Sequence, residues 1–131
     1  SRDGARGFFV VSLAGDSALM DRLPDALVIK LREAGDGVVD LTARNLAMSA
    51  AMAVHHRNNG DDEQASGSER VNQRCSELLR QLDSKRVKDR LEMLLDAAMH
   101  SRGEDLAFLE RWGYDDDQRR AIGDAVQAVA E

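Results

Sequence analysis

The sequence has few of the residues that stiffen small extracellular or loop-rich folds. Of its 131 residues, one is cysteine and one is proline, and aromatic residues make up 4%. Because Cys75 is the only cysteine, no disulfide can form within the chain, and nothing indicates an oxidising compartment. Scarce proline and scarce aromatic side chains predict a mostly helical chain with an aliphatic core.

Long apolar runs and the common cofactor motifs are also absent from the sequence. No apolar run approaches the roughly 20 residues of a membrane span, and neither GxxxxGK nor GxGxxG occurs. His55 and His56 are adjacent and would point to different sides of a helix, which makes a poor metal pair. We therefore expect no metal, no cofactor and no membrane contact, and we favour a non-catalytic protein of the cytoplasm.

Two short apolar runs stand in the first half of the chain, GFFVVSLAG at 7–15 and GVVDLTA at 37–43. Each is dense in β-branched residues and bounded by glycine, which predicts a buried strand. Leucines at four-residue spacing predict a helix between the two runs. These are Leu19, Leu23, Leu27 and Leu31. A second helix at 45–54 is apolar nearly all round, so it should be buried on more than one side.

The second half of the chain has helical spacing only. NNGDDEQASGSE at 58–69 is polar and predicts a linker. Beyond it, two apolar stripes predict either a helical hairpin or one long helix with a shifted stripe. The stripes are Val71, Cys75, Leu78 and Leu82, then Val87, Leu91, Leu94 and Ala98. Asp115–Asp117 are expected to cap the last helix.

These elements predict an α+β fold that is mostly helical. A small strand–helix–strand–helix unit at 7–57 is followed by the linker and by a helical part at 70–131, which packs on the unit or on a partner. Because two strands alone make a marginal sheet, helices or a second copy must cover them. We therefore favour a non-catalytic interaction or assembly domain that forms a homo-oligomer and binds protein partners. The predicted interface is Leu46, Met48, Met52 and Val54.

An alternative function, nucleic-acid binding, rests on the segment Ala43-Arg44-Asn45-Leu46-Ala47-Met48-Ser49-Ala50-Ala51. It resembles the Ala-Arg-Gly-x-Ala-Ile-Ser-x-Ala-like segment of the Alba family of nucleic-acid-binding proteins. The resemblance covers residues 8–57 and implies a dimeric domain in which Arg44 contacts the nucleic-acid backbone. A basic face would extend this site, and we call it the basic cluster: Arg80, Lys85, Arg86, Lys88 and Arg90. The net charge of −6 weighs against this alternative.

A second alternative is a hydrolase fragment. Gly15-Asp16-Ser17 follows the first predicted strand and resembles the first block of the SGNH esterases, which implies Ser17 as the nucleophile. Asp96 precedes His100 by four positions, whereas in that family the acid precedes the base by three. A serine without a positioned base is not activated, so a helix cap is the favoured role of Ser17.

Overall fold

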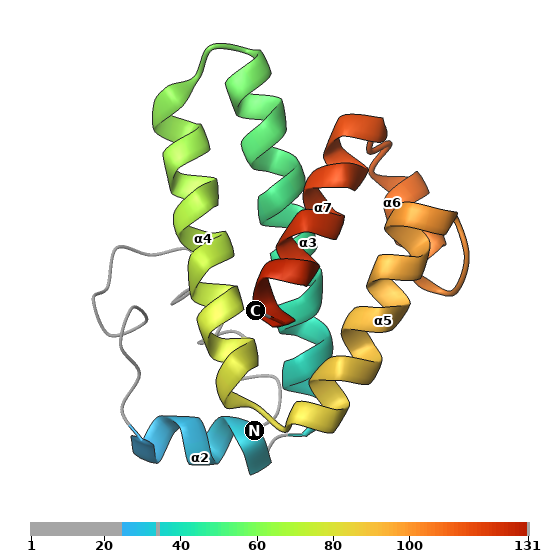
Figure 1. Cartoon of the computed structure of the whole chain (residues 1–131). Coiled ribbons are helices and arrows are strands. Elements are labelled where there is room, and N and C mark those ends of the chain that lie inside the picture. Colours follow the sequence, from blue (N-terminus) through green and yellow to red (C-terminus); the bar gives the residue numbers. More distant parts are fainter. Residues whose placement is uncertain (1–24, 34, 131) are drawn as a thin grey trace.

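The computed structural model describes residues 25–33 and 35–130, and its described elements are all helices. They are α2 (Asp25–Glu33), α3 (Asp36–Asn58), α4 (Asp62–Gln81), α5 (Ser84–His100), α6 (Asp105–Arg111) and α7 (Asp116–Ala130). Figure 1 shows α3 at the centre of the bundle, with α4 and α5 on either side and α7 across it. None of the described helices is long and apolar enough to cross a membrane.

The α+β prediction is wrong for the described part of the chain, which contains no strand. Residues 37–43, expected to form the second strand, are the first turns of α3. A short β-branched run cannot be told from a buried helical segment by periodicity alone. Here helical spacing of the buried positions Val39, Ala43, Leu46 and Ala50 continues through the run. The predicted strand at 7–15 and Ser17 lie outside the described residues.

The predicted linker at 58–69 is mostly helix. α3 ends at Asn58, and α4 begins at Asp62 after a three-residue connection. The Asp61 carboxylate accepts a hydrogen bond from the backbone N–H of Gln64, so it caps α4. A polar, glycine-containing stretch therefore forms the exposed first turns of a helix, in which Ala65 turns inward. The short connection makes α3 and α4 antiparallel neighbours (Figure 1).

The central position of α3 agrees with its apolar circumference. It contacts α4, α5 and α7, and its alanines let these helices approach closely. The two buried hydroxyls of α3 are satisfied within the helix: Thr42 donates to the carbonyl of Val38, and Ser49 to that of Leu46. Asn72 of α4 donates to the Leu46 carbonyl and to Ser49 Oγ, which fixes the register between the two helices.

The C-terminal helices are closed by a reciprocal cap. Asp115 accepts from the Gln118 backbone N–H at 2.8 Å, and the Gln118 side chain accepts from the Asp115 N–H at 3.0 Å. The predicted cap of the last helix is thereby confirmed at Asp115. The Gln118 amide also donates to the carbonyl of Ala51 at 3.1 Å, which joins the start of α7 to α3.

Candidate interaction site

Helix α5 is amphipathic. Of the two arrangements predicted for the apolar stripes, the structure has two separate helices, α4 and α5, and not one long helix. Asp83 accepts from the Arg86 backbone N–H and caps α5 where the stripe changes phase. Val87, Leu91 and Leu94 are buried. Beside this buried stripe, α5 has two open sides with different chemistry. One side faces α7, and the other faces α3 and α6.

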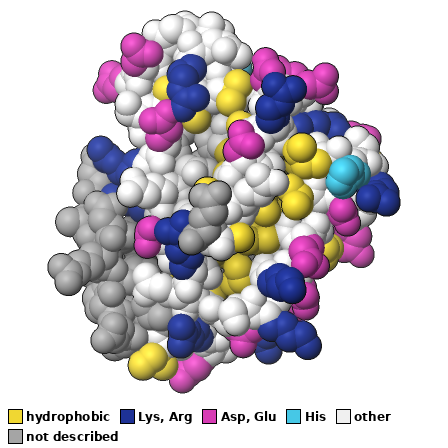
Figure 2. Space-filling model, viewed as in Figure 1, with side chains coloured by type: hydrophobic (Ala, Val, Ile, Leu, Met, Phe, Trp, Pro, Cys, Tyr) yellow, Lys and Arg dark blue, Asp and Glu magenta, His cyan; other side chains and the backbone are white. Residues whose placement is uncertain are grey.

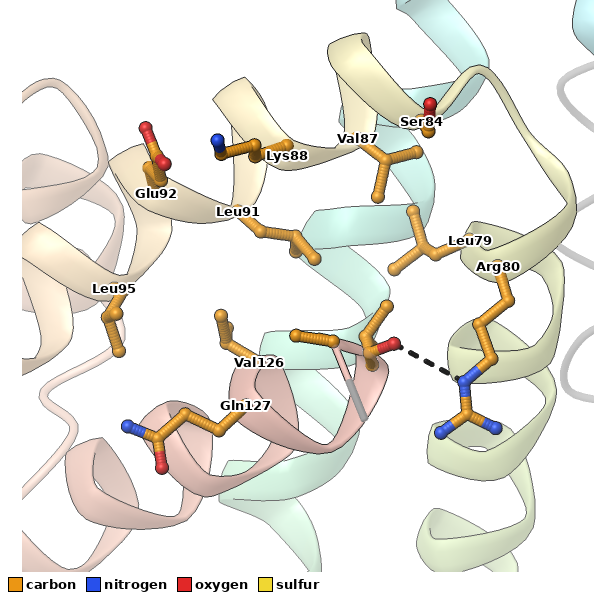
Figure 3. A pocket seen from close by; sticks show the side chains of 12 residues that line it. Leu79, Arg80, Ser84, Val87, Lys88, Leu91, Glu92, Leu95, Val126 and Gln127 are labelled. Atoms are coloured by element: carbon orange, nitrogen blue, oxygen red, sulfur yellow. Dashed lines mark hydrogen bonds between the residues drawn. The ribbon is translucent and has the colours of Figure 1, made fainter.

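The side facing α7 is an apolar hollow of about 530 Å³, which we call the α5–α7 groove. α4, α5 and α7 all contribute to its floor. The floor residues are Leu79, Val87, Leu91, Val126 and Val129. Figure 3 shows Leu79, Val87, Leu91 and Val126 directed into the hollow, with Lys88, Glu92 and Gln127 at its rim. In Figure 2 the hydrophobic side chains form a continuous strip in the hollow over α5 and α7.

Arg80 lines this groove and binds the C-terminal end of α7. Its guanidinium donates to the carbonyl of Ala128 at 2.6 Å and to that of Val129 at 3.4 Å. These are last-turn carbonyls with no helical N–H partner, and a cation at this end also opposes the negative helix dipole. Arg80 thus attaches the end of α7 to α4 at the edge of the groove.

The apolar strip extends past the groove along α5 to Met99. A Cβ placed on Gly123 of α7 would lie 2.8 Å from Met99 Sδ and 3.7 Å from Leu95 Cδ1. Gly123 therefore leaves the space in which these two side chains lie across α7. Met99 is still 50% exposed, although it belongs to the same face of α5 as Leu91 and Leu95. It is an apolar projection at the opposite end of the strip from Leu79.

The side facing α3 and α6 is a charged cleft of about 560 Å³. At its centre, Arg90 makes two hydrogen bonds to the Asp105 carboxylate, at 2.5 and 2.9 Å, and one to Asp40 at 3.0 Å. The Arg90 and Asp105 side chains are only 12% and 7% exposed. Burial alone would lower the pKa of Arg90, but the hydrogen bonds and charges of Asp105 and Asp40 raise it overall. The contact joins α5 to α6 and α3.

The other arginines of the charged cleft also face carboxylates of the same chain. Arg44 Nε lies 3.4 Å from Asp40, and Arg86 Nε lies 3.4 Å from Asp36. Three arginines and five carboxylates line this cleft in total. Each of these arginines is therefore paired within the chain, and the cleft carries two more carboxylates than arginines.

A family model described as "Uncharacterised conserved protein UCP020893" matches residues 1–129. The chain belongs to this family. No curated protein and no solved structure matches it. The assignment of a function to this UCP020893 member therefore rests on its own residues.

The structure divides the basic cluster between the two sides of α5. Arg86 and Arg90 lie in the charged cleft with Arg44, whereas Arg80 and Lys88 line the α5–α7 groove. Lys85 is exposed on α5. Arg80 and Arg86 also line a third hollow, of about 510 Å³, together with Arg32. Four of the arginines, however, already contact acids of the chain. Those ion pairs are Arg44–Asp40, Arg80–Glu77, Arg86–Asp36 and Arg90 with Asp40 and Asp105.

The residues predicted as an interface lie on α3, away from the groove. Leu46 is completely buried in the chain's own core. Met48, Met52 and Val54 are half-buried. The groove was missed because it depends on how α5 and α7 meet. One signal was available in the sequence: Leu95 and Met99 continue the four-residue spacing from Leu91.

The reactive side chains give no sign of a catalytic set in the described part of the chain. His55 and His56 lie in the last turn of α3, and His100 ends α5. The described residues contain no group of three or more metal-ligating side chains. Cys75 is fully buried, and burial raises the pKa of its thiol to about 12. It is therefore neutral near pH 7 and acts as a small apolar side chain.

Proposed function

We propose that this UCP020893 member is a non-catalytic interaction domain that receives an apolar element of a protein in the α5–α7 groove. The observation that carries this proposal is the apolar hollow between α5 and α7, whose floor consists of buried core side chains and whose rim is charged and polar. Protein-binding surfaces combine an apolar centre with a polar rim in this way. The cytoplasmic location stays a prediction.

The groove is suited to binding because its floor is already formed. The floor side chains are held by three packed helices, and Arg80 fixes the end of α7. A partner would therefore have little ordering to induce in this chain, which favours affinity. Filling the groove with one aliphatic side chain would contribute about 1.5–3 kcal/mol by removing that side chain from water.

Two alternatives have less support. Nucleic-acid binding needs accessible cations on one face, whereas Arg44, Arg86 and Arg90 contact carboxylates in the charged cleft. The hydrolase alternative rests on Ser17, which lies outside the described residues.

Site-specific photo-cross-linking in the source cell tests the proposal. The photoreactive residue p-benzoylphenylalanine replaces Gln127 at the groove rim, or Ala107 on α6 as an exposed control. We expect a discrete protein adduct from position 127 and none from position 107. The adduct should disappear when Leu95→Glu places a charge in the groove, while the helical circular dichroism spectrum is retained. Absence of a position-127 adduct, or an adduct that persists in Leu95→Glu, would contradict the proposal.

A further inference from the structure

We infer that the occupant of the α5–α7 groove is a second copy of this chain, related to the first by a twofold axis that crosses α5. This inference rests on the proposed function and names its partner. Two independent features of α5 support it: the arrangement of charge on the groove rim, and the position of the exposed Met99. One twofold axis would both pair the rim charges and place Met99 of each copy against the groove of the other.

The charges of α5 at the groove rim would pair with the same charges of a second, antiparallel copy of α5. Lys88 and Glu92 carry opposite charges, are exposed, and stand one helical turn apart at the rim of the groove (Figure 3). Their spacing would allow a pair within the helix, yet neither forms an ion pair with a described residue. When two copies of α5 cross antiparallel between these residues, Lys88 of each faces Glu92 of the other. One twofold axis thus creates two ion pairs.

The shape of the apolar strip agrees with the same axis. Met99 lies nine residues beyond the midpoint of Lys88 and Glu92, or about 14 Å along the helix at a rise of 1.5 Å per residue. In the antiparallel arrangement, Met99 of the second copy therefore lies just beyond Ser84, at the Leu79 end of the groove. Leu79, Arg80 and Ser84 line the hollow at this end, and Met99 is 50% exposed. An unbranched thioether suits such a site because it adapts to irregular spaces.

A twofold arrangement also closes the assembly. A head-to-tail contact could place Met99 in the groove of a neighbour, but each copy would leave one groove and one Met99 unused and would extend into a filament. The twofold arrangement fills both grooves at once. It also pairs both rim charges, which the head-to-tail contact does not. We therefore expect a dimer and no larger species.

Sedimentation equilibrium of the full chain over a wide concentration range tests the inference. The proteins are the natural chain, Lys88→Glu, Glu92→Lys and the double swap that carries both changes. Each single change creates two like-charge contacts across the axis and should raise the dimer Kd about tenfold. The double swap should restore the Kd, because opposite charges again face each other.

A matched control places the same swap elsewhere on α5. Lys85→Glu with Asp89→Lys has the same spacing and the same net charge as the swap of Lys88 and Glu92, but neither residue lines the groove. It should leave the Kd unchanged. Met99→Glu provides a second probe at an exposed position and should also raise the Kd about tenfold or more.

Several results would overturn the inference. These are a monomer at every concentration, a dimer whose Kd is unaffected by the single changes, and a double swap that does not restore association. Its failure can be told from failure of the proposed function. An adduct from position 127 with a different protein would leave the function standing and remove the second copy as occupant. Absence of any adduct would remove both.

Discussion

Helix α5 borders two hollows of similar size, one on each side. One is lined mainly by charged side chains and the other mainly by apolar side chains. On the side of α3 and α6, the central arginine, Arg90, is held by Asp105 and Asp40 of the same chain. On the side of α7, the hollow has a floor of buried apolar side chains and few charged groups. The size of a hollow therefore does not identify a binding surface here. The distinguishing property is whether the chain satisfies its own exposed groups.

The largest expected effect is a difference in alkylation rate between a thiol at the groove rim and the Cys75 thiol in the core. Cys75 has a pKa near 12, three units above the ordinary value of 9.0, so its thiolate fraction at pH 8 is reduced roughly a thousandfold. In Ser84→Cys, a second thiol stands at the groove rim, at the start of α5. We expect iodoacetamide to alkylate residue 84 at least roughly a thousandfold faster than Cys75 in dilute native protein. Comparable rates, measured by mass spectrometry of peptides, would show that the core is open.

The same thiol predicts a dependence of stability on pH. The unfolded chain loses the Cys75 proton near pH 9, whereas the folded chain keeps it until about pH 12. Its contribution is therefore fully present below pH 9 and is lost as the pH rises to 12, by about 4 kcal/mol for three pKa units. Urea unfolding of the natural chain and of Cys75→Ala should show this difference in slope. Parallel curves above pH 9 would contradict the assignment.

Next in size is the disruption of the charged cleft at Asp105. Asp105→Ala leaves the Arg90 guanidinium largely buried without its bidentate partner, which should lower the free energy of unfolding by about 3 kcal/mol. Asp40→Ala removes a half-exposed partner and should cost less than about 1 kcal/mol. Chemical denaturation measures both values. Equal losses would show that the bidentate contact has no special weight.

A change in the groove should separate association from stability. Leu95 is partly buried against the core, so Leu95→Glu should lower the free energy of unfolding by about 1–2 kcal/mol and leave the chain folded. The same change places a charge on the apolar strip and should abolish the position-127 adduct. Retained cross-linking together with a large loss of stability would mean that Leu95 serves the core and not a partner.

The smallest effect is expected at Arg44. Its contact with Asp40 is a half-exposed pair on one helix, which typically contributes about 0.3–0.5 kcal/mol. Arg44→Ala should therefore change stability by no more than about 0.5 kcal/mol and leave the dimer Kd unchanged. Anisotropy with labelled duplex DNA in a salt series checks the alternative function. Salt-dependent binding that is lost in Arg44→Ala would favour nucleic-acid recognition over the groove.

The sequence allowed the C-terminal helices to be predicted, because their stripes carry a clear helical period. Cys75, Leu78, Leu91 and Leu94 are buried as their spacing indicates. The residues at 37–43 were misassigned, because a buried helix and a buried strand both show a short continuous apolar run. The alanines that follow, such as Ala43 and Ala47, extend the helical period, and this was the better guide.

The candidate site was beyond a sequence-based prediction for a physical reason. The groove needs the end of α7 to lie against α4 and α5, and Arg80 secures it through carbonyls nearly 50 residues away. No local pattern encodes such a contact. The basic residues of 80–90 looked like one surface in the sequence, but helical geometry turns Arg80 and Lys88 toward the groove and Arg90 toward the charged cleft.

Two methionines on α5 offer the most direct test of the claim that the apolar side of this helix receives a second copy. Met99 continues the groove strip and Met93 lines the charged cleft, and they are 50% and 39% exposed. The measurement is a ¹³C-methyl-methionine NMR dilution series of the full chain. We predict that the Met99 methyl resonance shifts with concentration while that of Met93 stays in place. A stationary Met99 resonance, or a shift of Met93 instead, would contradict the claim.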